Sequence, residues 1–131
     1  MIFAIYGTDA YLCQEKLHEL QTGFVEKKDK GGLNVVRVFA DNLNFDNLAQ
    51  EAMTVPFLSE KKLIVISGLM SENSAARKKL RDQIADFIQT KEKAIENNLL
   101  FFDIFDDPKK IPVKDTLFNF LKKQQYQWEC N

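Results

Sequence analysis

The first residues that could do chemistry stand at the turn where an apolar opening run ends. A phosphate-binding loop there needs Gly-x-x-x-x-Gly-Lys-Ser/Thr, because backbone N–H groups surround the phosphates, the lysine reaches them and the hydroxyl holds Mg²⁺. In this chain the turn begins at Gly7, but Leu12 stands at the place of the second glycine and Cys13 at that of the lysine. Asp9 adds negative charge where phosphate would sit. These residues argue against nucleotide hydrolysis.

A second candidate is the apolar run Leu100-Phe101-Phe102 that ends in Asp103, similar to a strand ending in a Mg²⁺-binding carboxylate. Without a phosphate loop there is no bound nucleotide whose Mg²⁺ this carboxylate could hold. We therefore interpret Asp103, together with Asp106 and Asp107, as a solvated strand end. A phosphate-receiver domain would need an acceptor aspartate after the third strand, and Ser67-Gly68-Leu69 supplies none. A nucleotide-binding or phosphorelay α/β domain is therefore kept only as the alternative function.

Other groups suited to catalysis are sparse. The single histidine, His18, lies off the apolar stripe of its predicted helix, and we expect it to be exposed. The two cysteines, Cys13 and Cys130, lie near opposite ends of the chain without metal-ligand spacing, which predicts reduced, cytosolic thiols. No Ser-His-Asp, Cys-His or metal-binding grouping can be assembled, so the sequence predicts a non-catalytic protein with no cofactor and no metal.

Composition narrows the classes of partner. The chain has 131 residues, enough for one domain with a core, and its net charge of −1 gives no reason to expect a broad phosphate-binding surface. The apolar start has no basic region and stops at Gly7, which argues against a signal peptide. No apolar run approaches membrane-spanning length. We therefore expect a cytoplasmic protein with no membrane partner.

The stretch from Met53 to Lys62 places apolar residues in a short connection. Val55, Phe57 and Leu58 surround Pro56, which presets a helical φ and suits the first position of a short turn. Two interpretations stay open. The stretch forms a small apolar knob presented to a partner, or it forms a buried corner in which Phe57 folds back onto the sheet.

Strands and helices alternate along the chain and must position these residues. Continuous apolar runs separated by amphipathic helices predict an α/β fold with a mostly parallel sheet covered on both faces. We expect a single domain over residues 1–131, and a chain that stops on a strand suggests a fragment cut at a domain edge. The predicted strands are 2–6, 35–39, 62–67, 98–105 and 126–130. The first predicted helix runs from a cap at Thr8 or Asp9 to about Lys28, and the second from 45 to 53 after a cap at Asn44. The third runs from a cap at Asn73 or Ser74 to about Ala94, and the fourth from 113 to 124.

Three stretches carry a resemblance to a known family. Residues 1–12 join an apolar strand to Tyr-Gly, an acid and Tyr-Leu; residues 55–66 run Val-Pro-Phe-Leu-Ser-Glu-Lys-Lys-Leu-Ile-Val-Ile; residues 117–123 run Leu-Phe-Asn-Phe-Leu-Lys-Lys. In this order and spacing they resemble the delta subunit of the bacterial DNA polymerase III clamp loader. The resemblance covers essentially the whole chain, but only the first domain of the family's longer protein.

The resemblance implies a fold and a set of partners. The fold would be a P-loop NTPase-like AAA+ module with three layers and a five-stranded, mostly parallel sheet, whose phosphate loop has been lost. As a non-catalytic part of the DNA polymerase III holoenzyme, it would bind the ring-shaped sliding clamp (the beta subunit) and help open it for loading onto primed DNA. It would meet DNA indirectly and join the delta prime and tau/gamma subunits through lid and collar domains that lie outside this chain.

The resemblance also implies which residues touch the clamp. Members of the family insert two neighbouring apolar residues, from the segment before the third strand, into a hydrophobic pocket on the clamp. By position Phe57 is the best candidate, and its partner is Leu58 or Val55, because Pro56 and a one-residue difference in register leave this open. Met53 would line the base of the knob.

Overall fold

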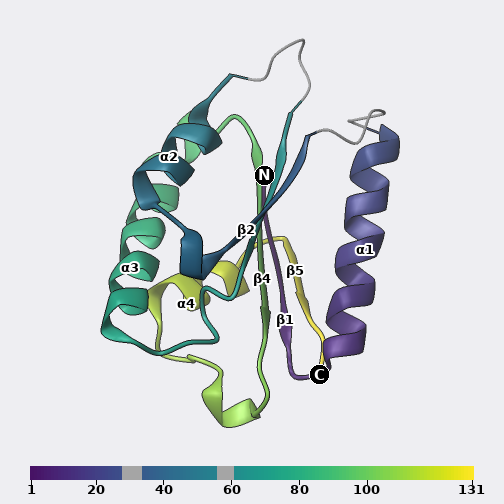
Figure 1. Cartoon of the computed structure of the whole chain (residues 1–131), viewed down its shortest axis with the longest axis vertical. Coiled ribbons are helices and arrows are strands. Elements are labelled where there is room, and N and C mark those ends of the chain that lie inside the picture. The colour runs from purple at the N-terminus through teal and green to yellow at the C-terminus, as the bar shows by residue number, and fades with distance from the viewer. Residues whose placement is uncertain (28–33, 56–60) are drawn as a thin grey trace.

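A five-stranded sheet forms the middle layer of the protein (Figure 1). The computed structural model describes residues 1–27, 34–55 and 61–131. The strands lie in the order β2-β3-β4-β1-β5, and each neighbouring pair is parallel. The predicted α/β class and parallel sheet are therefore confirmed. The strands are β1 (Ile2–Gly7), β2 (Val35–Phe39), β3 (Leu63–Ser67), β4 (Asn98–Ile104) and β5 (Tyr126–Glu129).

Helices cover both faces of the sheet, which explains why its central strands are continuously apolar. Helix α1 (Ala10–Lys27) lies on one face, whereas α2 (Phe45–Met53), α3 (Ala75–Thr90) and α4 (Thr116–Lys122) lie on the other (Figure 1). Each face has its own apolar core, one built on α1 and one on the three other helices. Every residue of β3 is buried, whereas Arg37 and Phe39 of the edge strand β2 are exposed.

Short polar side chains set where the helices begin, because each satisfies a backbone N–H that has no partner inside its helix. Of the two residues predicted to cap α1, Asp9 is the one that accepts a hydrogen bond from the first turn. The caps predicted at Asn44 and Ser74 are confirmed. The four capping bonds join Asp9 to the Leu12 N–H (3.0 Å), Asn44 to Asn47 (3.1 Å), Ser74 to Arg77 (3.1 Å) and Asp115 to Phe118 (3.1 Å).

Two helices are shorter than the sequence predicts. Helix α3 ends at Thr90 rather than near Ala94, and a 3-10 turn follows at Glu92–Ala94. Thr90 Oγ1 donates to the Asp86 carbonyl at 2.7 Å, and Lys91 leaves the helical region with φ −115° and ψ 20°. Helix α4 begins only at Thr116, because Asp115 takes the capping position. Apolar periodicity alone does not mark either boundary.

The interpretation of Asp103 as part of a solvated strand end is wrong. Its side chain is buried near the end of β4, with 1% of the residue exposed, and its Oδ1 accepts the backbone N–H groups of Met70 and Ser71, each at 3.0 Å. Asp106 is exposed and Asp107 half-buried, so of these three carboxylates only the two that follow the strand meet solvent. Asp103 thus anchors the loop that follows β3.

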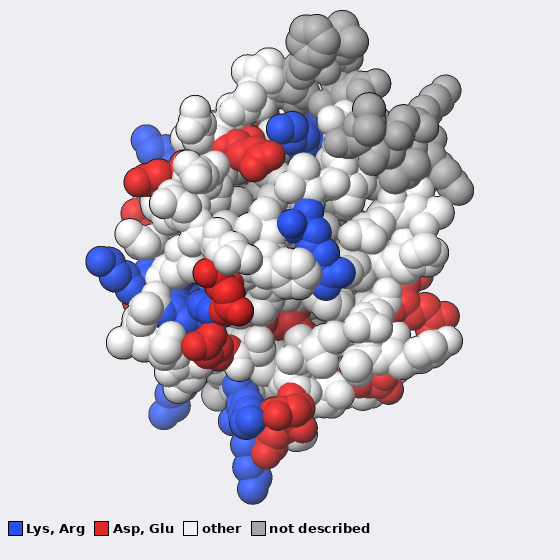
Figure 2. Space-filling model, in the orientation of Figure 1, with Lys and Arg blue, Asp and Glu red and all other residues white. Residues whose placement is uncertain are grey.

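Charges on the surface are mixed. On the face shown in Figure 2, the described basic and acidic side chains are interspersed, as expected for a chain with a net charge of −1. Within the three described ranges, no helix is both long and apolar enough to cross a membrane.

Candidate protein-interaction site

The predicted site lies between the end of α2 and the start of β3. Val55 is 73% exposed and Met53 is 36% exposed, so both apolar side chains face solvent. Pro56, Phe57 and Leu58 lie outside the described residues, so the knob and the buried corner both stay predictions. The described part of the stretch does present apolar surface.

Helix α2 is held firmly up to the point where this stretch begins. Its buried residues Leu48 and Ala52 belong to the core, and Phe45 packs edge-to-face on Phe87 of α3 with ring centroids 6.0 Å apart. The helix ends at Thr54, whose backbone is extended at φ −68° and ψ 127°, and the Thr54 Oγ1 donates to the Gln50 carbonyl at 2.7 Å. The exposed Met53 and Val55 thus lie at the end of a helix that is packed against the core.

One buried side chain, that of Asn97, bonds the residues on both sides of segment 55–61. The residue is 1% exposed and lies just before β4. Its Nδ2 donates to the carbonyls of Glu51 at 2.8 Å and Thr54 at 3.2 Å, and its Oδ1 accepts the Lys62 N–H at 2.9 Å. Sequence reasoning missed Asn97, because nothing near it in the chain signals partners more than 30 residues away.

Backbone hydrogen bonds reinforce the same place. The N–H groups of Glu96 and Asn97 both donate to the Ala52 carbonyl, at 3.0 and 3.2 Å, and the Asn98 N–H donates to the Lys62 carbonyl at 2.9 Å. An ion pair between Lys62 Nζ and Glu51 Oε1, 3.2 Å apart, spans the two ends as well. Both charged side chains are about one-third exposed, so the pair contributes at most about 1 kcal/mol.

The turn after β1, where a phosphate loop would lie, is filled by the chain itself. The Thr8 N–H donates to Asn131 Oδ1 at 3.1 Å, and the Asp9 N–H donates to the Cys130 carbonyl at 3.0 Å. Gly7 has φ +154°, and a Cβ built on it would lie 2.0 Å from the Cys130 carbonyl oxygen. The donors that would surround a phosphate therefore already have partners.

The same contact brings the two cysteines together, which their distance in sequence concealed. Cys13 Sγ donates to the Cys130 carbonyl at 3.6 Å, and both residues are free cysteines. Burial, and then the neighbouring Cys130 and Asp9, raise the pKa of the Cys13 thiol to about 12. Cys13 is therefore a protonated thiol at neutral pH, poorly suited to act as a nucleophile.

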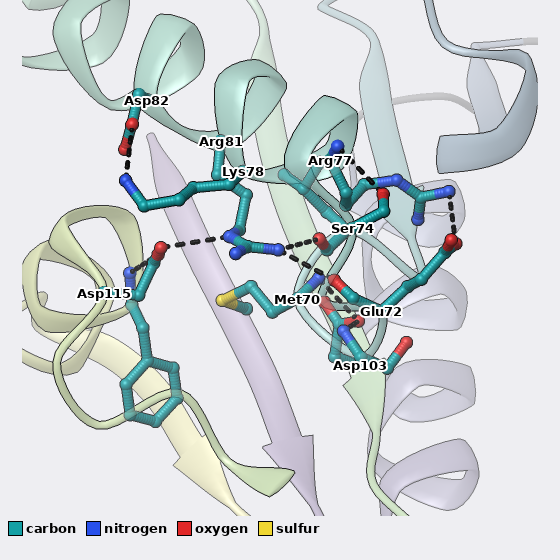
Figure 3. A network of polar contacts seen from close by, with 12 residues as sticks. Met70, Glu72, Ser74, Arg77, Lys78, Arg81, Asp82, Asp103 and Asp115 are labelled. Carbon is teal, nitrogen blue, oxygen red and sulfur yellow. Dashed lines mark hydrogen bonds and ion pairs between the residues drawn. The ribbon is translucent and has the colours of Figure 1, made fainter.

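Two arginines in the basic first half of α3, Arg77 and Arg81, are buried and paired within the molecule (Figure 3), whereas Lys78 and Lys79 are exposed. Arg77 pairs with Asp41 at 2.6 Å and Glu72 at 2.8 Å. Arg81 pairs with Asp115 at 3.0 Å and donates to the Glu72 carbonyl at 2.9 Å. These two arginines tie the loop between β3 and α3 to its neighbours, and they are not available to a phosphate-bearing partner.

Burial raises the pKa of Asp103 from its ordinary value near 3.8 to about 7, although the hydrogen bonds from Met70 and Ser71 and the charge of Arg77 oppose the change. Its Oδ2 is buried without a hydrogen-bond partner. Within the described part of the chain, no group of three or more histidine, cysteine, aspartate and glutamate side chains is placed to hold a metal ion. We interpret Asp103 as a structural carboxyl group.

Comparison with known proteins adds to this geometry. A search of curated sequences gives no significant match. Among solved structures, the Bacillus subtilis DNA clamp loader delta protein (YqeN) superposes with a TM-score of 0.66 at 18% identity, over 98% of this chain and 38% of that one. At this identity the match supports the fold, and the chain spans well under half the length of that relative. The family model for the DNA polymerase III delta subunit matches residues 3–131. Since that match covers nearly the whole chain, the chain belongs to the DNA polymerase III delta subunit family.

Proposed function

We propose that this chain is the clamp-binding domain of a clamp-loader delta subunit, which binds the sliding clamp and helps open it for loading onto primed DNA. The observation that carries the proposal is the exposure of Met53 and Val55 at the end of a firmly held helix. They lead directly into Phe57 and Leu58, the pair that the family resemblance assigns to the clamp pocket. A few buried apolar anchors can supply most of the binding energy of such an interface.

The proposed role is non-catalytic. The fold would be AAA+-like, with the phosphate loop lost. The Gly7–Asp9 turn supports this, because two of its backbone N–H groups already donate hydrogen bonds to Cys130 and Asn131. The cognate beta clamp is the direct partner. The delta prime and tau/gamma subunits would bind through lid and collar domains outside residues 1–131, and DNA would be met through the assembled loader.

The test compares clamp binding by the wild-type domain and by Phe57→Ala/Leu58→Ala. We expect the double variant to weaken binding by about 2–4 kcal/mol, or roughly 30- to 1000-fold in Kd, because hot-spot anchors have this size. Calorimetric titration against the clamp gives Kd, and thermal melts show whether each variant is folded. If Phe57 were a buried corner, the same change would lower the melting temperature instead.

The matched control is Tyr11→Ala/Leu12→Ala, which removes two neighbouring apolar side chains at another exposed place. Tyr11 is 72% exposed and Leu12 is 43% exposed, on the first turn of α1. This variant should keep the wild-type Kd. Failure of the wild-type domain to bind the clamp at micromolar concentration would refute the proposal, and equal losses in both double variants would refute the assigned residues.

A further inference from the structure

We propose that Asn97 is a positioning residue for clamp binding: its buried side chain fixes the spacing between Thr54 and Lys62, the two residues that flank segment 55–61. The inference rests on the proposed function, and it concerns a residue outside the apolar segment. Asn97 itself has no path to the clamp, because it is 1% exposed. Any effect on binding must therefore pass through the residues that it holds.

All described hydrogen bonds of the Asn97 side chain go to residues just before or just after this segment. On one side it donates to the carbonyl of Glu51, in the last turn of α2, and to that of Thr54, the residue after the helix. On the other side it bonds the Lys62 N–H, just before β3 begins. A single rigid amide group therefore joins the point where the segment leaves the helix to the point where it enters the sheet.

Fixing both ends of a short segment favours binding because fewer conformations are lost when the partner docks. The exposed Val55 directly follows Thr54, so its position depends on the Thr54 carbonyl that Asn97 holds. Removal of the side chain leaves the Glu51 and Thr54 carbonyls and the Lys62 N–H without this partner. The backbone bonds from Glu96 and Asn97 to Ala52 do not need the side chain, so the strand start should stay in place.

The decisive variant is Asn97→Ala, compared with Asn44→Ala. Asn44 caps the opposite end of the same helix through the Asn47 N–H, so its loss also destabilises α2 but leaves segment 55–61 untouched. Binding to the clamp is measured at a temperature far below the melting point of both variants, where both are fully folded. We expect Asn97→Ala to weaken binding about tenfold, which corresponds to about 1.4 kcal/mol, and Asn44→Ala to match the wild type.

Amide hydrogen exchange supplies a local readout that is independent of the clamp. In Asn97→Ala the Lys62 amide should exchange faster, because its acceptor is gone. The neighbouring Leu63 amide, which donates to the Asn34 carbonyl at 2.8 Å, should keep its protection. Asn97→Asp retains an oxygen for Lys62 but lacks the donor to Glu51 and Thr54, so it should weaken binding while leaving the Lys62 amide protected.

The outcomes separate the two proposals. If the wild type binds the clamp and folded Asn97→Ala binds equally well with an unprotected Lys62 amide, the positioning role is overturned and the proposed function stands. If both Asn97 variants are unfolded even at 10 °C, Asn97 only maintains the fold, which also overturns it. If the wild type does not bind the clamp, the proposed function fails and this inference fails with it.

Discussion

The burial and hydrogen bonding of single residues in this protein depend on neighbours that are distant in sequence, and Asp103 is the clearest case. It lies in a strand with apolar neighbours, yet it accepts two backbone N–H groups from the loop after β3. One carboxylate oxygen is satisfied and the other is buried without a partner. A charge in that place is costly, which is why the pKa of Asp103 rises to about 7.

The raised pKa of Asp103 predicts that the domain loses stability as pH increases from about 4 to about 7. In this window the folded state holds a proton that the unfolded state, with a pKa near 3.8, has released, so the free energy of unfolding falls with pH. The loss is on the order of 4 kcal/mol if the whole difference in pKa is expressed. Asp103→Asn keeps a carbonyl for the Met70 and Ser71 amides and cannot ionise, so it should remove this slope.

Urea unfolding at pH 5 and pH 8 measures the effect. The control is Asp106→Asn, an exposed carboxylate after the same strand, which should keep the wild-type difference between the two pH values. An identical pH dependence in wild type and Asp103→Asn would show that Asp103 is ionised at neutral pH in the folded domain.

At the scale of elements, one ion pair joins α3 to the start of α4. The side chains of Arg81 and Asp115 are 3% and 6% exposed, and Asp115 also caps α4 through the Phe118 N–H. Removal of one partner leaves a buried charge unpaired, which typically costs about 3–5 kcal/mol. Removal of both should cost less than the sum of the two single changes.

A double-mutant cycle with Arg81→Met and Asp115→Asn tests this coupling, since asparagine can still cap α4. We expect a coupling energy of about 1.5 kcal/mol or more from denaturant melts. The comparison pair on the same helix is Lys78 and Asp82, 3.0 Å apart but 65% and 48% exposed, for which a cycle should give at most about 0.5 kcal/mol. Equal coupling in the two cycles would contradict the argument from burial.

Interactions between residues near in sequence could be predicted from the sequence, whereas interactions between distant residues could not. Caps such as Asn44 and Ser74 act within three residues, so they could be identified from local sequence, as could the buried stripe of α3 at Ile84, Phe87 and Ile88. Asp103, Arg81 and Asn97 have partners more than 30 residues away or in loops, so their burial could be known only after the sheet was assembled. For the candidate site, sequence and resemblance selected the segment, whereas the buried amide that holds its ends emerged from the structure.

At the scale of the whole molecule, the first and last elements meet at the carboxyl edge of the sheet. Strand β5 lies beside β1, and the Cys130 N–H donates to the Tyr6 carbonyl at 2.8 Å. The chain then crosses the β1–α1 turn, so close to Gly7 that no side chain fits there. In parallel α/β sheets this edge is where nucleotides bind, and here protein occupies the donors of that turn.

The filled turn predicts that Mg-ATP will not stabilise this domain. A nucleotide bound only to the native state at 100 times its Kd would add about 2.7 kcal/mol to the free energy of unfolding. For a domain of 131 residues this would raise the melting temperature by roughly 10 °C. Bound phosphates would have to displace Cys130 and Asn131 from the Thr8 and Asp9 amides, so we expect no change in melting temperature.

The measurement is a thermal melt with and without millimolar Mg-ATP, alongside a protein with an intact phosphate loop. A rise in melting temperature that Asn131→Ala enhances would mean that the chain competes with a nucleotide for this turn, and the nucleotide-binding alternative would then replace the non-catalytic one.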